Sequence, residues 1–148
     1  MSHLLDFETQ VTSQEALIRA LCRMGFTREQ VEIHDKATRI NGYHTDENKV
    51  GNIIIRQSNT KIPSDIGWEL GKTGSYVEHV DDYQYWNTDK HYNTEWKSKL
   101  YTYYNVELSR MELDAKGIQY KESKDTKGRI QIEAMFEVKD EEQIRIRL

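Results

Sequence analysis

The sequence has little of several residue types that mark particular protein classes. It contains one cysteine, Cys22, and one proline, Pro63, in 148 residues. A single cysteine excludes an internal disulfide framework, which many small secreted domains use to compensate for a small core. No run approaches the ~20 apolar residues of a membrane-spanning helix, and the first residues lack the basic start and apolar stretch of a secretion signal. We therefore expect a cytoplasmic protein.

An excess of positive charge is also lacking. Lys and Arg number 21 against 25 Asp and Glu, so the formal net charge is −4. Binding to nucleic acid or to an anionic membrane needs a clustered positive field. The basic residues from 97 to 116 are interleaved with acidic ones, a pattern typical of a solvated face. The composition therefore argues against nucleic acid and membrane as partners.

Two segments have the periodicity of amphipathic helices. In the first, Thr12 and Glu15 have capping-box spacing and apolar residues then recur on one face, which predicts a helix over 13–24. In the second, large residues recur every three or four positions and predict a helix over 94–116. This second stripe consists of Tyr92, Trp96, Leu100, Tyr104, Leu108, Met111 and Ala115. Both predicted helices end in Leu, then Gly four residues later, then an apolar residue, which predicts positive φ at Gly25 and Gly117.

The remaining segments alternate with period two, as strands do. They lie at the N-terminus and near 31–33, 39–41, 50–56, 66–70, 76–80, 118–120 and 130–138. The resulting order, β-α-β-β-β-β-α-β-β, favours an α+β fold in which a mostly antiparallel sheet carries two helices on one face. We interpret residues 1–148 as a single domain, with 139–148 forming either an extra strand or a frayed tail.

Several short motifs follow one another in a fixed order along nearly the whole chain. They are Met1-Ser2-His3, Leu17 to Phe26, Asn41-Gly42-Tyr43, Asp65-Ile66-Gly67-Trp68, and Gly74-Ser75-Tyr76 before Asp81. Together they resemble the family called domain of unknown function 1257, which includes an uncharacterised reading frame of chloroplast and cyanobacterial genomes and also occurs in bacteriophages. The family's usual aromatic-glycine segment is replaced here by Asp82-Tyr83-Gln84-Tyr85-Trp86, so the chain resembles a divergent member. Family members are often encoded beside an AAA-type ATPase. The resemblance therefore implies a bacterial or bacteriophage accessory protein and indicates no enzymatic activity.

The segment from 81 to 92 is the main candidate for a binding site. It is acidic and aromatic and has no clean period, which predicts an irregular loop. Large aromatic side chains in such a loop are typical contact anchors for a protein partner or a planar ligand. A loop that folds down to close the open end of the sheet explains the same residues, and both interpretations stay open. The candidate binding residues are Tyr76, Asp81, Asp82, Tyr83, Tyr85, Trp86 and Tyr92.

Metal-ligating residue types are densest near the same loop. His79, His91 and Glu95 are the candidates, and imidazole with carboxylate suits zinc, manganese or iron. Neither an HExxH nor a CxxC pattern accompanies them, and polar loops collect such residues routinely. We therefore predict no metal site, and the sequence specifies no cofactor.

Two further patterns resemble functional motifs, but the residues around them do not support those functions. Gly71-Lys72-Thr73 resembles the end of a phosphate-binding loop, but the glycine required five positions earlier is absent and a strand follows instead of a helix. A hairpin turn explains these residues better. Cys22 with His34 would supply a nucleophile and a base, but we expect Cys22 to be a small hydrophobe beside the buried face of the first helix.

These observations favour a non-catalytic accessory or adaptor protein. We expect it to bind another protein, an AAA-type ATPase, through the aromatic-acidic loop. The first alternative is a protein that binds or sequesters a small nucleotide-like ligand between aromatic rings. The second alternative is an enzyme with an unrecognised metal site.

Overall fold

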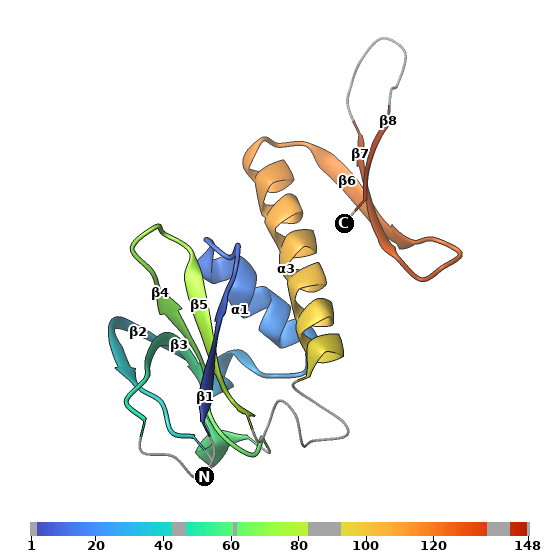
Figure 1. Cartoon of the computed structure of the whole chain (residues 1–148). Helices are drawn as coiled ribbons and strands as arrows, with labels where there is room; N and C mark the ends of the chain where they lie inside the picture. The colour runs from blue at the N-terminus through green and yellow to red at the C-terminus, as the bar shows by residue number, and fades with distance from the viewer. Residues whose placement is uncertain (1–2, 43–46, 61, 83–92, 136–142, 148) are drawn as a thin grey trace.

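The computed structural model describes residues 3–42, 47–60, 62–82, 93–135 and, by their backbone only, 143–147. Figure 1 shows the arrangement of the elements. Their order is β1 (Leu4–Glu8), α1 (Gln14–Arg23), β2 (Val31–Arg39), β3 (Val50–Ile55), β4 (Ile66–Leu70), β5 (Tyr76–Asp81), α3 (Thr94–Ala115), β6 (Gln119–Lys124), β7 (Ile130–Met135) and β8 (Gln143–Arg147), with short 3₁₀ helices at Arg28–Gln30 and Gln57–Asn59.

The strands form two antiparallel sheets. The larger has the order β1-β5-β4-β3-β2 and the smaller has the order β6-β7-β8. The predicted α+β class and element order are confirmed. The structure adds that the strands after α3 form a sheet of their own and do not extend the first one (Figure 1).

Both helices pack on one face of the five-stranded sheet and against each other. The core between these layers contains Leu17 and Leu21 of α1, Trp68 of β4, and Leu100 and Tyr104 of α3. Each of these side chains is at least 97% buried, and burial of a large apolar side chain contributes about 1.5–3 kcal/mol. Within the described residues, no helix combines the length and the apolar character needed to cross a membrane.

The helix ends follow their local sequence. Helix α1 begins one residue later than the predicted capping box implies, because the Ser13 side chain, and not that of Thr12, accepts a hydrogen bond from the Ala16 amide. The predicted glycine ends are confirmed: Gly25 has φ 108° and Gly117 has φ 67°. In each case the following apolar residue donates its amide to the leucine carbonyl, at 3.3 Å for Phe26 and 2.9 Å for Ile118.

Helix α3 contacts both sheets, and the predicted stripe covers only one of its two buried faces. Leu100 and Tyr104 of the stripe lie in the main core. Val106 and Leu113, which lie off the stripe, pack against Ile130, Ile132 and Ala134 of β7. A helix between two sheets buries apolar residues on two sides, so a single 3.6-residue period does not describe it.

The Asp65-Ile66-Gly67-Trp68 motif has a structural role. The buried Asp65 carboxylate accepts hydrogen bonds from the backbone amides of Asn41 (2.9 Å) and Gln57 (2.8 Å) and from the Arg56 guanidinium (2.8 Å). A Cβ atom on Gly67 would lie 2.9 Å from Cγ2 of Ile40. These residues therefore hold the segment after β2 against the sheet face that carries no helix.

Candidate functional site

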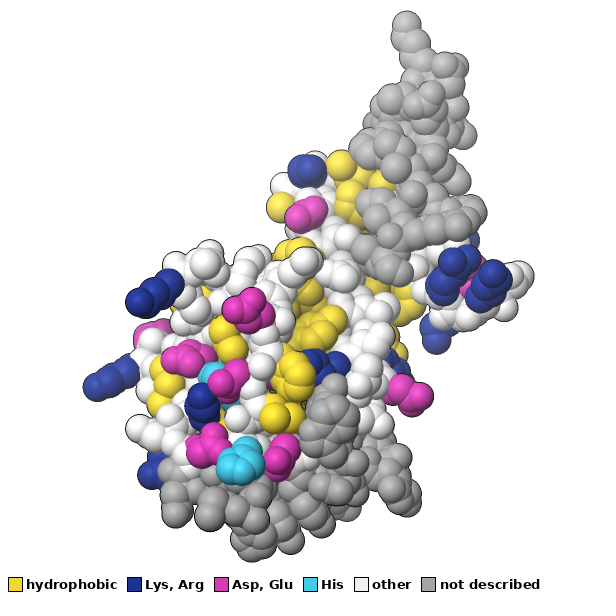
Figure 2. All heavy atoms as spheres, viewed as in Figure 1, with side chains coloured by type: hydrophobic (Ala, Val, Ile, Leu, Met, Phe, Trp, Pro, Cys, Tyr) yellow, Lys and Arg dark blue, Asp and Glu magenta, His cyan; other side chains and the backbone are white. Residues whose placement is uncertain are grey.

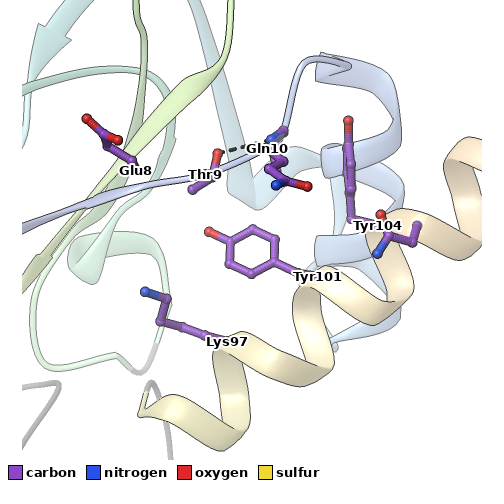
Figure 3. Close-up of a pocket in the computed structure, with 8 residues that line it drawn as sticks. Glu8, Thr9, Gln10, Lys97, Tyr101 and Tyr104 are labelled. Atoms are coloured by element: carbon purple, nitrogen blue, oxygen red, sulfur yellow. Dashed lines mark hydrogen bonds between the residues drawn. The ribbon is translucent and has the colours of Figure 1, made fainter. Parts of the chain in front are cut away.

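A pocket lies between the end of β1 and helix α3. In the space-filling view, hydrophobic side chains line the furrow between the five-stranded sheet and α3 (Figure 2). The pocket has a volume of about 340 Å³, within the range of roughly 300–1,000 Å³ usual for small-molecule sites. Figure 3 shows the Tyr101 side chain reaching from α3 towards the segment after β1. The lining residues are Glu8, Thr9, Gln10, Val11, Lys97, Tyr101, Tyr104 and Asn105.

The wall formed by residues 9–11 is fixed by hydrogen bonds to strand β5. The Thr9 hydroxyl donates to the Tyr76 carbonyl at 2.5 Å and accepts from the Val11 amide at 3.1 Å. The Tyr76 amide in turn donates to the Val11 carbonyl at 2.9 Å. The backbone on this side of the pocket is therefore held in place without a ligand.

Tyr104 fixes the end of the pocket next to α1. Its hydroxyl accepts hydrogen bonds from the amides of Thr12 (3.0 Å) and Ser13 (3.1 Å). These amides precede the first turn of α1, where backbone donors have no partner within the helix. Because two acceptor positions of the hydroxyl are occupied, only its proton is left for a further hydrogen bond.

A buried ion pair lies beside the pocket. Glu78 of β5 points to the helix-covered face of the sheet and is 1% exposed. Lys97 Nζ lies 3.1 Å from Glu78 Oε2 and forms an ion pair with it. The Lys97 ammonium also lies 3.3 Å from the centre of the Phe7 ring, a cation–π contact. Lys97 is thus held between a carboxylate and an aromatic face while it lines the pocket.

The ion pair continues into a hydrogen-bonded chain. Trp68 Nε1 donates to the Tyr101 hydroxyl at 3.2 Å, and this hydroxyl interacts with Glu78. Burial raises the pKa of Glu78, against the opposing effect of Lys97 and Tyr101. Burial also raises the pKa of Tyr101, and the neighbouring Glu78 carboxylate adds to that rise. Buried titratable groups beside a pocket are typical of functional sites.

The residues predicted from the sequence to bind a partner fall into three groups. Tyr76 and Asp81 are buried, at 5% and 0% exposure, so neither presents its side chain at the surface. Asp82 is half-buried and accepts a hydrogen bond from the His3 amide at 3.0 Å. Tyr83, Tyr85, Trp86 and Tyr92 lie outside the described residues, so the role of the 81–92 segment stays a prediction.

The metal candidates do not converge in the described part of the chain. His79 lies on the helix-free sheet face, with Nδ1 2.6 Å from Asp6 and Nε2 3.0 Å from Glu69. Because the carboxylates flank opposite ring nitrogens, the three groups cannot share one ion. Glu95 is exposed on α3, and His91 lies outside the described residues. Among the residues described, no three His, Cys, Asp or Glu side chains form a site for a metal ion.

The remaining sequence candidates give no site. Cys22 is exposed, so the expectation that it packs as a small hydrophobe beside the buried face of α1 is wrong. His34 hydrogen-bonds Glu32, its neighbour two residues earlier on β2. Gly71 and Ser75 close a hairpin turn by a hydrogen bond of 2.9 Å from the Gly71 amide.

Sequence reasoning missed the pocket and its ion pair, although one signal was present. Tyr76, Glu78 and Val80 occupy successive positions on the same face of β5. Because Tyr76 and Val80 face the core, the alternation indicates that the Glu78 carboxylate between them is buried as well. Its partner Lys97 gave no such signal, since it follows Trp96 on a helix with many charges.

Comparison with known proteins places the chain in a family. Neither a curated protein nor a solved structure matches it. The family model described as "Protein of unknown function (DUF1257)" matches residues 20–132, which is more than half of the chain. The match includes the Asp65–Trp68 motif and both members of the Glu78–Lys97 pair. The chain therefore belongs to the DUF1257 family.

Proposed function

We propose that this chain is a non-catalytic accessory protein that binds a small polar ligand in the pocket between β1 and α3. The observation that carries the proposal is the buried Glu78–Lys97 pair beside a pocket lined by two tyrosines and by polar side chains. Aromatic surfaces with a few placed polar groups are the usual composition of small-molecule sites. Of the functions considered from the sequence, this geometry supports the small-ligand alternative best.

The energetics of the pair support a role beyond stability. A buried ion pair seldom stabilises a fold more than apolar side chains of the same size, because both charges lose their hydration. Here the carboxylate is 1% exposed and the Lys97 side chain is 17% exposed, so both charges have lost most of their contact with water. Burial of this pair costs free energy, so the presence of Lys97 at the pocket wall is better explained if a ligand binds to its ammonium group.

Native mass spectrometry of the gently purified protein tests the proposal. We expect a non-covalent adduct of small mass on the wild type, lost on denaturation. Asn105→Trp places an indole into the pocket from an exposed helix position and should remove the adduct. Glu112→Trp places the same side chain on an exposed part of α3 outside the pocket lining and should retain it. An adduct that persists in both variants would place the ligand elsewhere.

A second candidate function is binding of a protein partner, an AAA-type ATPase, through the 81–92 segment. The observation that favours it is the fixed position of both ends: Asp81 ends a central strand, and Asn93 caps α3 by accepting a hydrogen bond from the Trp96 amide at 3.1 Å. Loops held by a rigid scaffold often carry binding residues. Trp86→Ala should keep the melting temperature and lose the ATPase in a pull-down. Retention of the ATPase by a normally folded variant would remove this candidate.

A further inference from the structure

We propose that the ligand of this pocket carries an acid group that pairs with Lys97, and that Glu78 takes up a proton when the ligand binds. This inference rests on the proposed function, because it names the ligand class of the same pocket. It assigns different roles to the two members of the ion pair. Lys97 recognises the ligand, and Glu78 releases Lys97 for that purpose.

The charges along the pocket wall favour an acid over other ligands. Among the described residues that line the pocket, Lys97 is the one cationic side chain and Glu8, at the exposed rim, is the one acidic side chain. The Lys97 side chain is 17% exposed, whereas that of Glu78 is 1% exposed. The ligand therefore meets the ammonium and not the carboxylate behind it. Because the Lys97 side chain is mostly buried, an acid group gains more from this ammonium than from a lysine at the open surface.

Binding of an acid places two anions around one cation. Among the described residues, the groups that face Glu78 are Lys97 and Tyr101 from α3, Trp68 from β4 and Phe7 from β1, and Lys97 is the cation among them. His79, the next residue on β5, lies on the opposite face between Asp6 and Glu69, and its positive charge when protonated also favours the Glu78 carboxylate. Two neighbouring carboxylates with one shared counter-charge cannot both stay ionised at low cost, so one of them binds a proton. Glu78 is the group that takes it, because it is the more deeply buried and burial already favours its neutral form.

Three small probes of similar shape separate the ligand classes: benzoate, benzamide and benzamidine. Their binding is followed by amide and side-chain NMR shifts of the wild-type protein, at a series of pH values. We expect benzoate to bind at least about tenfold more tightly than benzamide, a difference near 1.4 kcal/mol, and benzamidine to bind most weakly. If one proton is taken up with each benzoate, its affinity falls by up to about tenfold per pH unit above the range in which Glu78 titrates.

Glu78→Gln supplies the decisive variant, because it keeps the size of the side chain and removes its charge. Lys97 then has no competing carboxylate, so benzoate should bind more tightly than to the wild type and without the pH dependence. Lys97→Gln alone leaves a buried uncompensated carboxylate and can unfold the protein. The double variant Glu78→Gln, Lys97→Gln avoids this, and it should bind benzoate and benzamide equally.

The outcomes separate this inference from the function on which it rests. Benzamide binding as well as benzoate, or Glu78→Gln binding benzoate no more tightly than the wild type, would overturn the acid-ligand inference and keep the ligand pocket. Preference for benzamidine would overturn it as well. If no probe shifts the resonances of residues 9–11 or 97–105, both the inference and the pocket proposal fail.

Discussion

The main body and the small sheet are held in different ways. The five-stranded sheet and the two helices enclose a continuous apolar core that runs from Val11 to Tyr104. The β6–β8 sheet shares a much smaller apolar contact with α3, centred on Val106 and Ile132. Since apolar burial is the dominant stabilising contribution, the body is expected to be the stable unit and the small sheet the part that opens first.

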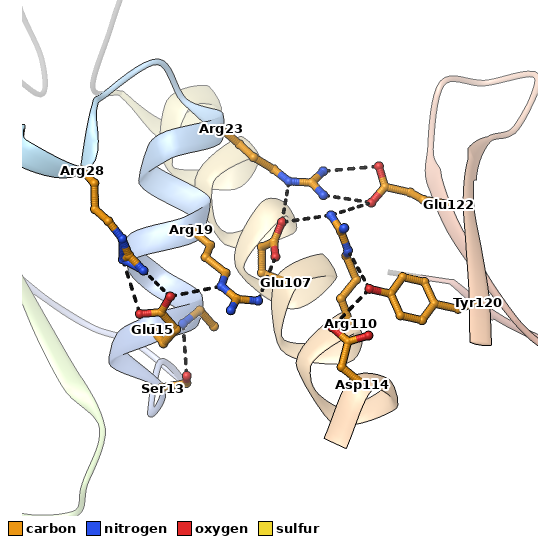
Figure 4. A network of polar contacts seen from close by, with 11 residues as sticks. Ser13, Glu15, Arg19, Arg23, Arg28, Glu107, Arg110, Asp114, Tyr120 and Glu122 are labelled. Atoms are coloured by element: carbon orange, nitrogen blue, oxygen red, sulfur yellow. Dashed lines mark hydrogen bonds and ion pairs between the residues drawn. The ribbon is translucent and has the colours of Figure 1, made fainter. Parts of the chain in front are cut away.

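Ion pairs replace apolar packing at the joint between the two regions. Glu107 of α3, 6% exposed, accepts a hydrogen bond from Arg23 of α1 at 2.7 Å. Arg23 also reaches Glu122 of β6 at 2.9 Å, while Arg110 approaches Tyr120 of β6 at 3.3 Å (Figure 4). One network thus connects both helices to the small sheet. A joint of this kind depends on charge, and therefore on salt and pH, more than the core does.

The largest loss of stability is expected from a substitution at Asp65 in the main body. Asp65→Ala leaves two backbone amides without their acceptor and removes the buried carboxylate from Arg56, which keeps only Glu32 and the Arg39 carbonyl among the described residues. Removal of one partner of a buried pair costs about 3–5 kcal/mol, so thermal unfolding of the whole chain should shift strongly downward. Asp35→Ala, at an exposed position on β2, is the matched control and should melt within a few degrees of the wild type. Equal melting of the two variants would contradict the role given to the motif.

A smaller and more local effect is expected at the joint. Glu107→Gln removes the charge that Arg23 and Arg110 share, and hydrogen bonds to charged groups contribute about 1.5–3 kcal/mol. Amide exchange measured by mass spectrometry should become faster in β6 and β7, with β3 to β5 unchanged. Faster exchange throughout the body would show that the two regions are not separable.

The glycines that end α1 and α3 allow the same substitution to be compared in the main body and next to the small sheet. Gly25→Ala and Gly117→Ala both force a side chain into positive φ, at a cost of about 1 kcal/mol. Gly25 ends a helix of the body, so its variant should lower the melting temperature. Gly117 leads into β6, so its variant should mainly accelerate exchange in the small sheet. If both variants lowered the melting temperature equally and left β6 unchanged, the comparison would fail.

Acid should act on the two regions in opposite directions, and this is the smallest effect. The hydrogen bond from Arg23 lowers the pKa of Glu122, so the stability that Glu122 gives the joint is present above its ordinary range and is lost as the pH falls through its folded-state pKa. Burial raises the pKa of Glu78, so protonation of Glu78 makes the body more stable as the pH falls towards 4.5, its ordinary value. Exchange at a series of pH values should therefore show the joint opening below pH 4.5 while the body is retained. Glu78→Gln should remove the gain in the body.

The sequence predicted elements better than it predicted their partners. The two glycine helix ends and the order of the strands depend on local pattern, and the structure confirms them. The separate small sheet depends on the second buried face of α3, where Val106 and Leu113 do not follow the main stripe. The pocket depends on Lys97 meeting Glu78, 19 positions earlier in the chain, and no local period encodes such a contact. Cys22 shows the same limit, because its exposure is set by what packs against α1 and not by its own helix.

Hydrogen–deuterium exchange tests the central claim most directly. The purified protein is exchanged with and without the low-molecular-mass fraction of a cell extract, and protection is followed along the chain by mass spectrometry. A ligand between β1 and α3 should protect residues 8–13 and 97–105 together and leave β6 and β7 unchanged, with no protection in Asn105→Trp. Protection confined to other segments, or equal protection in Asn105→Trp and the wild type, would contradict a ligand site in this pocket.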